Sequence, residues 1–174
     1  MQQLDLFPVS VRAPQGFLYQ PEFLSEADEA ELLLYLRGLK LKNYEHGEYI
    51  AKRKVRWFTG TAMPVPIQRL RNAVAQWAGI NPERIDNALV SKYEAGAPIG
   101  WHRDRPPYHT VLGVSLGSAC RFRLRKRDGK GWKRFMQIAA PRSVYLMSGS
   151  ARSLWQHSIP PVESIRYSIT FRTL

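Results

Sequence analysis

Residues 110–126 read TVLGVSLGSACRFRLRK, two short runs that are apolar or alternating and are separated by a glycine and serine turn. The second run alternates strictly, so Phe122 and Leu124 are expected on one strand face and the neighbouring arginines on the other. Comparable runs, each bounded by Gly, Pro or Asp, occur at 88–93, 143–147 and 164–172. The pattern predicts several short strands in the C-terminal half of the chain.

Two helices are expected before these strands. Residues 25–38 begin with Ser25 as a plausible N-cap, carry acidic residues in the first turn and end at a glycine. A second helix is predicted from Pro66 to about Trp77, with Gly79 after its end. Two helices followed by many short strands indicate an α+β chain, a β-sandwich or jelly roll with the helices packed on one face.

The composition limits the class of protein. The chain has 174 residues, of which 44% are hydrophobic, and 26 basic against 14 acidic residues give a net charge of +12. This content is typical of one folded domain, and the charge favours a nucleic-acid partner over a merely well-solvated surface. The single cysteine, Cys120, excludes an intrachain disulfide and a multi-cysteine metal site. No signal peptide or long apolar run is found, so we expect a cytoplasmic protein without membrane contact.

The sequence WHRD at 101–104 is a candidate metal site. Side chains two residues apart in a strand lie on one side, so His102 and Asp104 could reach the same ion. His157, shortly before the last predicted strand, is the candidate third ligand. Two histidines and one carboxylate leave open positions on non-haem Fe(II). A short His-x-Asp pair also occurs by chance, so the spacing alone leaves a surface or core histidine open.

The last predicted strand, RYSITFR at 166–172, is a candidate anion site. Alternation places Arg166, Ser168, Thr170 and Arg172 on one face. Two buried arginines need an anion, and a dicarboxylate along the strand would satisfy both. An edge strand with its arginines in water is the alternative.

Four segments, WHRD, GVSLGS, SLWQHSIP and RYSITFR, together resemble the AlkB family of Fe(II)- and 2-oxoglutarate-dependent dioxygenases over residues 88–174, and more loosely before that. The resemblance implies a double-stranded β-helix, or jelly roll, with Fe(II) as cofactor and 2-oxoglutarate as cosubstrate. It makes His102, Asp104 and His157 the iron ligands and catalytic residues. It implies a cosubstrate site of Tyr93, Ser91, Arg166, Ser168 and Arg172. The two serines stand where the family commonly has asparagine and reach less far.

A basic and aromatic stretch, AKRKVRWFTG at 51–60, corresponds in this resemblance to a lid over a flipped nucleotide, at about 43–63. The substrate-binding residues expected from it are Trp57, Arg53, Arg56 and, beside the metal motif, Trp101. The alternative is that the aromatics of the stretch belong to the core and its cations face solvent.

The N-terminal residues QLDLF resemble the peptide by which bacterial repair proteins bind the sliding clamp, through Gln3, Leu4, Leu6 and Phe7. They lie in an extension, residues 1–15, before the dioxygenase domain at 16–174. The alternative is that they pack on that domain.

We therefore expect a monomeric dioxygenase that oxidatively dealkylates nucleic-acid bases in alkylation repair, with DNA favoured over RNA. An RNA or tRNA base demethylase or hydroxylase of the same chemistry is one alternative. A non-catalytic basic nucleic-acid-binding module and an oxygenase acting on a protein side chain are the others. The basic hairpin predicted at 121–134 either contacts nucleic acid or is a solvated face.

Overall fold

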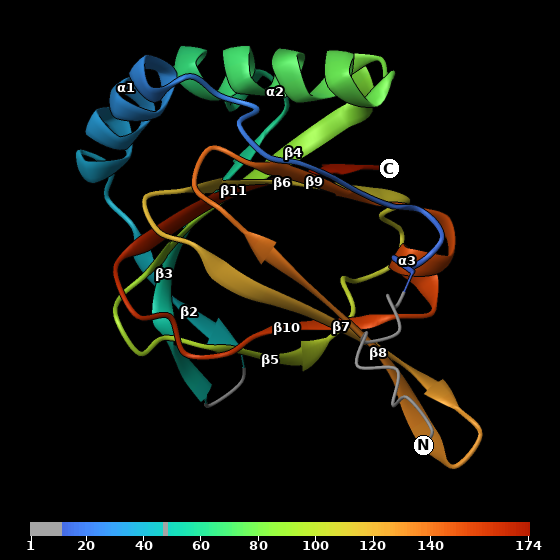
Figure 1. The fold of residues 1–174 in the computed structure, drawn as a ribbon. Coiled ribbons are helices and arrows are strands. Elements are labelled where there is room, and N and C mark those ends of the chain that lie inside the picture. Colours follow the sequence, from blue (N-terminus) through green and yellow to red (C-terminus); the bar gives the residue numbers. More distant parts are fainter. Residues whose placement is uncertain (1–11, 47–48) are drawn as a thin grey trace, which may run out of the picture.

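A computed structural model describes residues 12–46 and 49–174, and shows two facing sheets with two helices over one of them (Figure 1). The seven-stranded major sheet has the order β1-β9-β6-β11-β4-β3-β2, and the four-stranded minor sheet the order β5-β10-β7-β8. All pairings are antiparallel. This is the predicted jelly roll with helices on one face.

The elements in chain order are β1 (Phe17–Gln20), α1 (Glu26–Arg37), β2 (Lys42–His46), β3 (Tyr49–Thr59), α2 (Val65–Ala78), β4 (Ile85–Tyr93), β5 (Ile99–His102), β6 (Thr110–Leu116), β7 (Cys120–Asp128), β8 (Gly131–Ala139), β9 (Val144–Met147), α3 (Gly149–Ser153), β10 (Gln156–Ile159) and β11 (Arg166–Thr173). Short 3-10 turns precede α2 and β4. None of the helices within the described residues is long and apolar enough to cross a membrane.

Both predicted helices are present and end where the sequence indicates. Ser25 caps α1 through a capping box: its Oγ accepts from the backbone N–H of Asp28 at 3.1 Å, and the Asp28 carboxylate accepts from the Ser25 backbone N–H at 3.3 Å. Gly79 ends α2 with φ 66° and ψ 32°, the left-handed conformation that glycine adopts without strain.

The major sheet separates two apolar cores. Leu36, Ile67 and Val74 from the helices pack against Ile169 and other side chains on one face of the sheet. The second core lies between the two sheets and contains the stacked rings of Phe122 and Tyr145, with centroids 4.5 Å apart. Because side chains alternate along each strand, the same strands serve the helix-side core and the space between the sheets.

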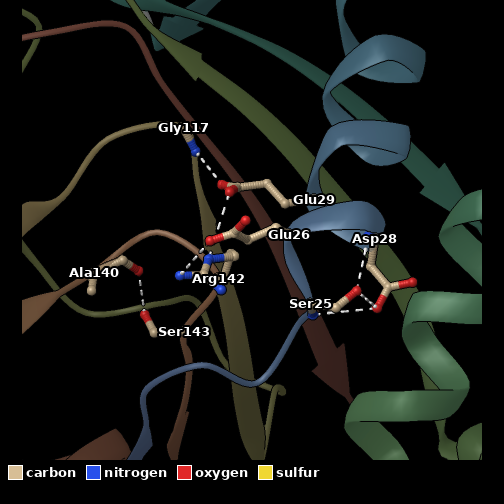
Figure 2. Close-up of polar contacts among 8 residues, drawn as sticks. All are labelled: Ser25, Glu26, Asp28, Glu29, Gly117, Ala140, Arg142 and Ser143. Atoms are coloured by element: carbon tan, nitrogen blue, oxygen red, sulfur yellow. Dashed lines mark hydrogen bonds and ion pairs between the residues drawn. The ribbon is translucent and has the colours of Figure 1, made fainter.

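Ion pairs and hydrogen bonds attach the start of α1 to the connections between strands (Figure 2). Glu29 Oε1 accepts a hydrogen bond from the Gly117 backbone N–H at 2.9 Å, and Glu29 Oε2 lies 3.9 Å from Arg142 Nε. The Arg142 backbone in turn accepts from Leu24 N–H and donates to the Ser115 carbonyl. The helix is thereby fixed over the major sheet.

The five predicted C-terminal strands correspond to β4, β6, β7, β9 and β11. Strands β1, β5 and β10, of four residues each, were not among these predicted strands. The predicted lid region forms most of β2 and all of β3, at the edge of the major sheet. The predicted clamp residues Gln3, Leu4, Leu6 and Phe7 lie outside the described residues, and clamp binding stays a prediction.

Candidate active site

The predicted metal residues come together between the sheets. Strand β10 pairs with β5 so that His157 is opposite His102, and their ring centroids lie 4.2 Å apart. Asp104 follows β5 by two residues, and its Oδ2 lies 3.7 Å from His157 Nε2. The pairing of β10 with β5 therefore brings Asp104 and His157 together although they are 53 residues apart in the sequence.

The chemistry of this donor set fits a non-haem Fe(II) ion. Two ligand atoms bound at about 2.1 Å are separated by about 3 Å at a right angle and about 4 Å at their widest, and the 3.7 Å separation falls between these values. His102 Nδ1 lies 2.9 Å from the Gly100 carbonyl, so Nδ1 carries the proton and Nε2 is available for a metal. Burial, and then the neighbouring His102, lower the pKa of His157 to about 3, which keeps it neutral as a ligand must be.

Arg172 holds the carboxylate of Asp104. Its Nη2 and Nε donate to Asp104 Oδ1 at 2.9 and 3.2 Å, which leaves Oδ2 toward His157. Burial opposes the charge of Asp104, but Arg172 and then His157 hold its pKa below the ordinary value. No three His, Cys, Asp or Glu side chains in the described part of the chain have the spacing of a completed metal site.

Arg166 is a buried cation that lacks an anionic partner among the described residues. Its side chain is 1% exposed, its Nε donates to Ser115 Oγ at 3.1 Å, and its Nη1 has no hydrogen-bond partner. The guanidinium lies over the Tyr93 ring, 5.1 Å from the centroid. An unpartnered buried guanidinium is costly, and a carboxylate is the ligand that would satisfy it. The predicted alternative of an edge strand in water is excluded, because β11 lies between β4 and β6.

The other predicted cosubstrate residues line the same cavity. Ser91 and Ser168 are directly opposite each other on β4 and β11, and Tyr93 is opposite Arg166. The enclosed space is about 40 Å³, room for about three water molecules.

Two of the four predicted substrate residues lie at this cavity. Arg53 lines it, and Trp57 is on the same face of β3, opposite Leu89 of the lining. The Trp57 ring is 46% exposed and lies 5.2 Å from the Arg172 guanidinium. An accessible indole thus adjoins the cation that holds Asp104.

The structure does not place Arg56 or Trp101 among the residues that line this cavity. Arg56 is three residues from Arg53 in a strand and so faces the opposite side, where its guanidinium lies over Phe58 and donates to the Lys40 carbonyl at 3.5 Å. Trp101 precedes His102 in β5 and faces away from it, against Arg125 on the outer surface of the minor sheet.

Three residues at or beside the site were missed in the sequence, and two of them, Ser115 and Arg152, do not line the cavity. Ser115, the serine of GVSLGS, is opposite Ser168 and accepts from Arg166. Tyr145 lies so close over Gly113 that a Cβ there would be 2.2 Å from its ring. Arg152 of α3 is 9% exposed and donates to the Arg105 carbonyl at 2.8 Å, next to the metal motif. Alternation signals Ser115, but nothing local signals the other two.

Comparison with known families gives one match that spans most of the chain. A family profile described as the 2OG-Fe(II) oxygenase superfamily matches residues 16–172. An uncharacterized protein of Acanthamoeba polyphaga mimivirus is 31% identical over 105 residues, 53% of this chain and 50% of that protein. The match spans only half the length of this relative.

Solved structures share the fold at low identity. OsALKBH1 has a TM-score of 0.69 at 16% identity, covering 91% of this chain and 98% of that one. A Trichoplax adhaerens prolyl hydroxylase, in complex with a hypoxia inducible factor peptide, has a TM-score of 0.70 at 17% identity over 91% and 83%. A Pseudomonas putida prolyl-4-hydroxylase has a TM-score of 0.63 at 16% identity over 91% of each chain.

Proposed function

This chain belongs to the 2OG-Fe(II) oxygenase superfamily, and from that premise we propose that it oxidatively dealkylates nucleic-acid bases, with DNA as the favoured substrate. The superfamily assigns Fe(II) as its cofactor and 2-oxoglutarate as its cosubstrate. The base substrate and the role in alkylation repair are the proposal.

In this proposal His102, Asp104 and His157 hold the iron. Arg172 orients Asp104 by two hydrogen bonds, and Gly100 orients His102 by accepting from Nδ1. Bound iron and cosubstrate would supply the oxidation: one atom of O₂ would enter succinate as 2-oxoglutarate loses CO₂, and the other would hydroxylate an N-alkyl carbon. The C–N bond would then break, the hydroxylated group would leave as an aldehyde, and its hydroxyl proton would pass to the base nitrogen or to solvent.

Arg166 binds a carboxylate of 2-oxoglutarate. It has the free donor Nη1, and Ser91 and Ser168 supply hydroxyls on the same wall. Because the guanidinium is buried between the two sheets, this ion pair is shielded from water and from salt.

The single observation that carries the substrate class is the charge and shape around the cavity. Among the described residues that line it, Asp104 is the only acid, and Arg53, Arg166 and Arg172 are cations. The accessible ring of Trp57 beside Arg172 offers a flat apolar face. Arg166 and Arg172 are already assigned to the cosubstrate and to Asp104, so Arg53 is the lining cation left for the substrate. A cation beside a stacking ring suits a flipped base and its phosphate better than a neutral peptide side chain.

The test is succinate and aldehyde release by the purified protein with Fe(II), 2-oxoglutarate and O₂. Methylated single-stranded DNA, methylated RNA, a proline-containing peptide and no substrate are assayed in parallel. We expect methylated DNA to stimulate succinate release and to yield an equal amount of aldehyde. Stimulation by RNA alone, or by the peptide, would replace the proposed substrate.

Variants connect this activity to the site. His102→Ala should abolish both products, whereas His109→Ala, a change to an exposed histidine, should leave them unchanged. Trp57→Ala should lower aldehyde more than succinate, because it impairs positioning of the base and not of the cosubstrate. Full activity of His102→Ala would contradict the assignment of the iron ligand.

A further inference from the structure

More than half of the net charge of this chain is concentrated in one hairpin. Residues 120–139, which form β7, β8 and their turn, contain eight Lys or Arg and one acidic residue, a net charge of +7 out of +12. No ion pair joins these cations to an acidic side chain within the part of the chain that the structure describes. The hairpin extends beyond the body of the fold (Figure 1).

The register places many of these cations on the surface of the minor sheet that faces away from the active site. His157, a candidate iron ligand, is opposite Leu124, so the residues on either side of Leu124 in β7 face outward. We call the outward set the outer strip: Trp101, Arg121, Arg123, Arg125, Arg127, Trp132 and Arg134.

The outer strip interleaves cations with indole rings. Arg125 lies between Trp101 and Trp132, 4.2 and 4.1 Å from their centroids. Arg127 also lies over Trp132, at 5.0 Å, and Arg123 over Trp101, at 5.0 Å. Neutral groups hold two of the guanidiniums: Arg125 Nε donates to Gln156 Oε1 at 2.9 Å and Arg123 Nε to Ser158 Oγ at 3.1 Å. The cations are therefore ordered without losing their charge.

The outer strip is long enough for several nucleotides, and a groove runs along it. A cavity of about 450 Å³ lies along it, lined by Trp101, Arg123, Leu124, Arg134, Phe135 and Met136. From Arg121 to Arg127 the strand spans about 20 Å. A stacked single strand has a phosphate about every 3.4 Å, so this length holds about six phosphates.

We propose that the outer strip binds a single strand of nucleic acid, separately from the active site on the other face of the sheet. Guanidiniums contact phosphates, and the indoles of Trp101 and Trp132 stack with bases. The inference goes beyond the proposed function, because it needs no chemistry on the bound strand. It gives the chain a second contact with the same polymer and retains the substrate between encounters.

The experiment measures binding of a fluorescein-labelled oligothymidylate of about 16 nucleotides to the full chain by anisotropy, over a series of salt concentrations. The test variant is Arg127→Gln with Arg134→Gln. The matched control, Arg69→Gln with Arg84→Gln, removes two exposed arginines away from the minor sheet. Thermal unfolding of each variant verifies that it is folded.

Loss of two phosphate contacts should reduce the steepness of the negative slope of log K against log salt by about 1.4. It should also lower the affinity about 25-fold at 0.1 M salt. Trp132→Leu should weaken binding about fivefold or more with an unchanged slope, because stacking releases no counterions. Wild-type affinity and slope in the arginine variant, or an equal loss in the control, would overturn the proposal. Competition by polyglutamate as effective as that by DNA would assign the strip to an acidic protein instead.

Turnover separates this inference from the proposed function. With a methylated trinucleotide, too short to reach the strip, the arginine variant should keep the kcat/KM of the wild type, and with a long methylated strand kcat/KM should fall. Binding through the strip without any demethylation would refute the proposed function alone. Demethylation with unchanged binding by the variant would refute the strip alone.

Discussion

Replacing Arg166 by Met should preserve or raise the stability of the protein but should weaken the binding of 2-oxoglutarate. The guanidinium is 1% exposed, has one hydrogen bond to Ser115 at 3.1 Å and leaves Nη1 unpartnered. Replacing a buried, uncompensated charge by an apolar side chain of similar length costs little or is favourable. When 2-oxoglutarate is absent, we therefore expect the free energy of unfolding of Arg166→Met to lie within about 1 kcal/mol of the wild-type value or above it.

Cosubstrate binding should instead be lost. Hydrogen bonds to a charged group contribute about 1.5–3 kcal/mol each, so removal of the guanidinium should raise the Kd for 2-oxoglutarate about a hundredfold or more. At a concentration of about 100 Kd the ligand stabilises the wild type by about 2.7 kcal/mol, a rise in Tm of about 5–10 °C for a chain of this size. The same concentration should raise the Tm of the variant by only about 1 °C.

The assay is thermal unfolding with and without 2-oxoglutarate, in the presence of Fe(II) and without O₂. Arg152→Met is the matched control, since Arg152 is also buried, has one hydrogen bond, to the Arg105 carbonyl, and one unpartnered nitrogen, but does not line the cosubstrate cavity. It should change the Tm as little as Arg166→Met does and keep the full shift with 2-oxoglutarate. If Arg166→Met unfolds at much lower temperature and keeps that shift, Arg166 is a structural residue and the reasoning fails.

Two further predictions concern stability and are measured by urea unfolding. Gly113→Ala should lower the free energy of unfolding by about 2–3 kcal/mol, because the new Cβ would lie 2.2 Å from the buried Tyr145 ring. The control Gly100→Ala, with open space around it, should lower it by less than about 1 kcal/mol. Equal losses in the two variants would show that the ring moves freely. Glu29→Ala should lower the free energy of unfolding by about 1 kcal/mol, because the Gly117 N–H loses its acceptor at 2.9 Å. Glu29→Gln keeps an amide oxygen there and should retain most of this stability. Equal stabilities of the two variants would refute the role of this hydrogen bond.

Local signals in the sequence determined the elements of the fold that depend on neighbouring residues. The capping box at Ser25 and the left-handed residue Gly79 fix helix ends through contacts within a turn. Alternation in the last strand correctly placed Arg166 and Arg172 on one face, because the period of two is a property of any strand. The same rule would have separated Arg56 from Arg53, but the run of basic residues in 52–56 hid the alternation.

Tertiary structure decided what lies beside what. Only the pairing of β10 with β5 places His157 opposite His102, and only the central position of β11 buries Arg166. The sequence predicted the residues of the site from their chemistry and from family resemblance, but it contained no local sign that Arg172 bonds to Asp104 or that Trp101 packs against Arg125. These contacts join residues distant in the chain, and their geometry follows from strand register, which is set by the packing of both sheets together.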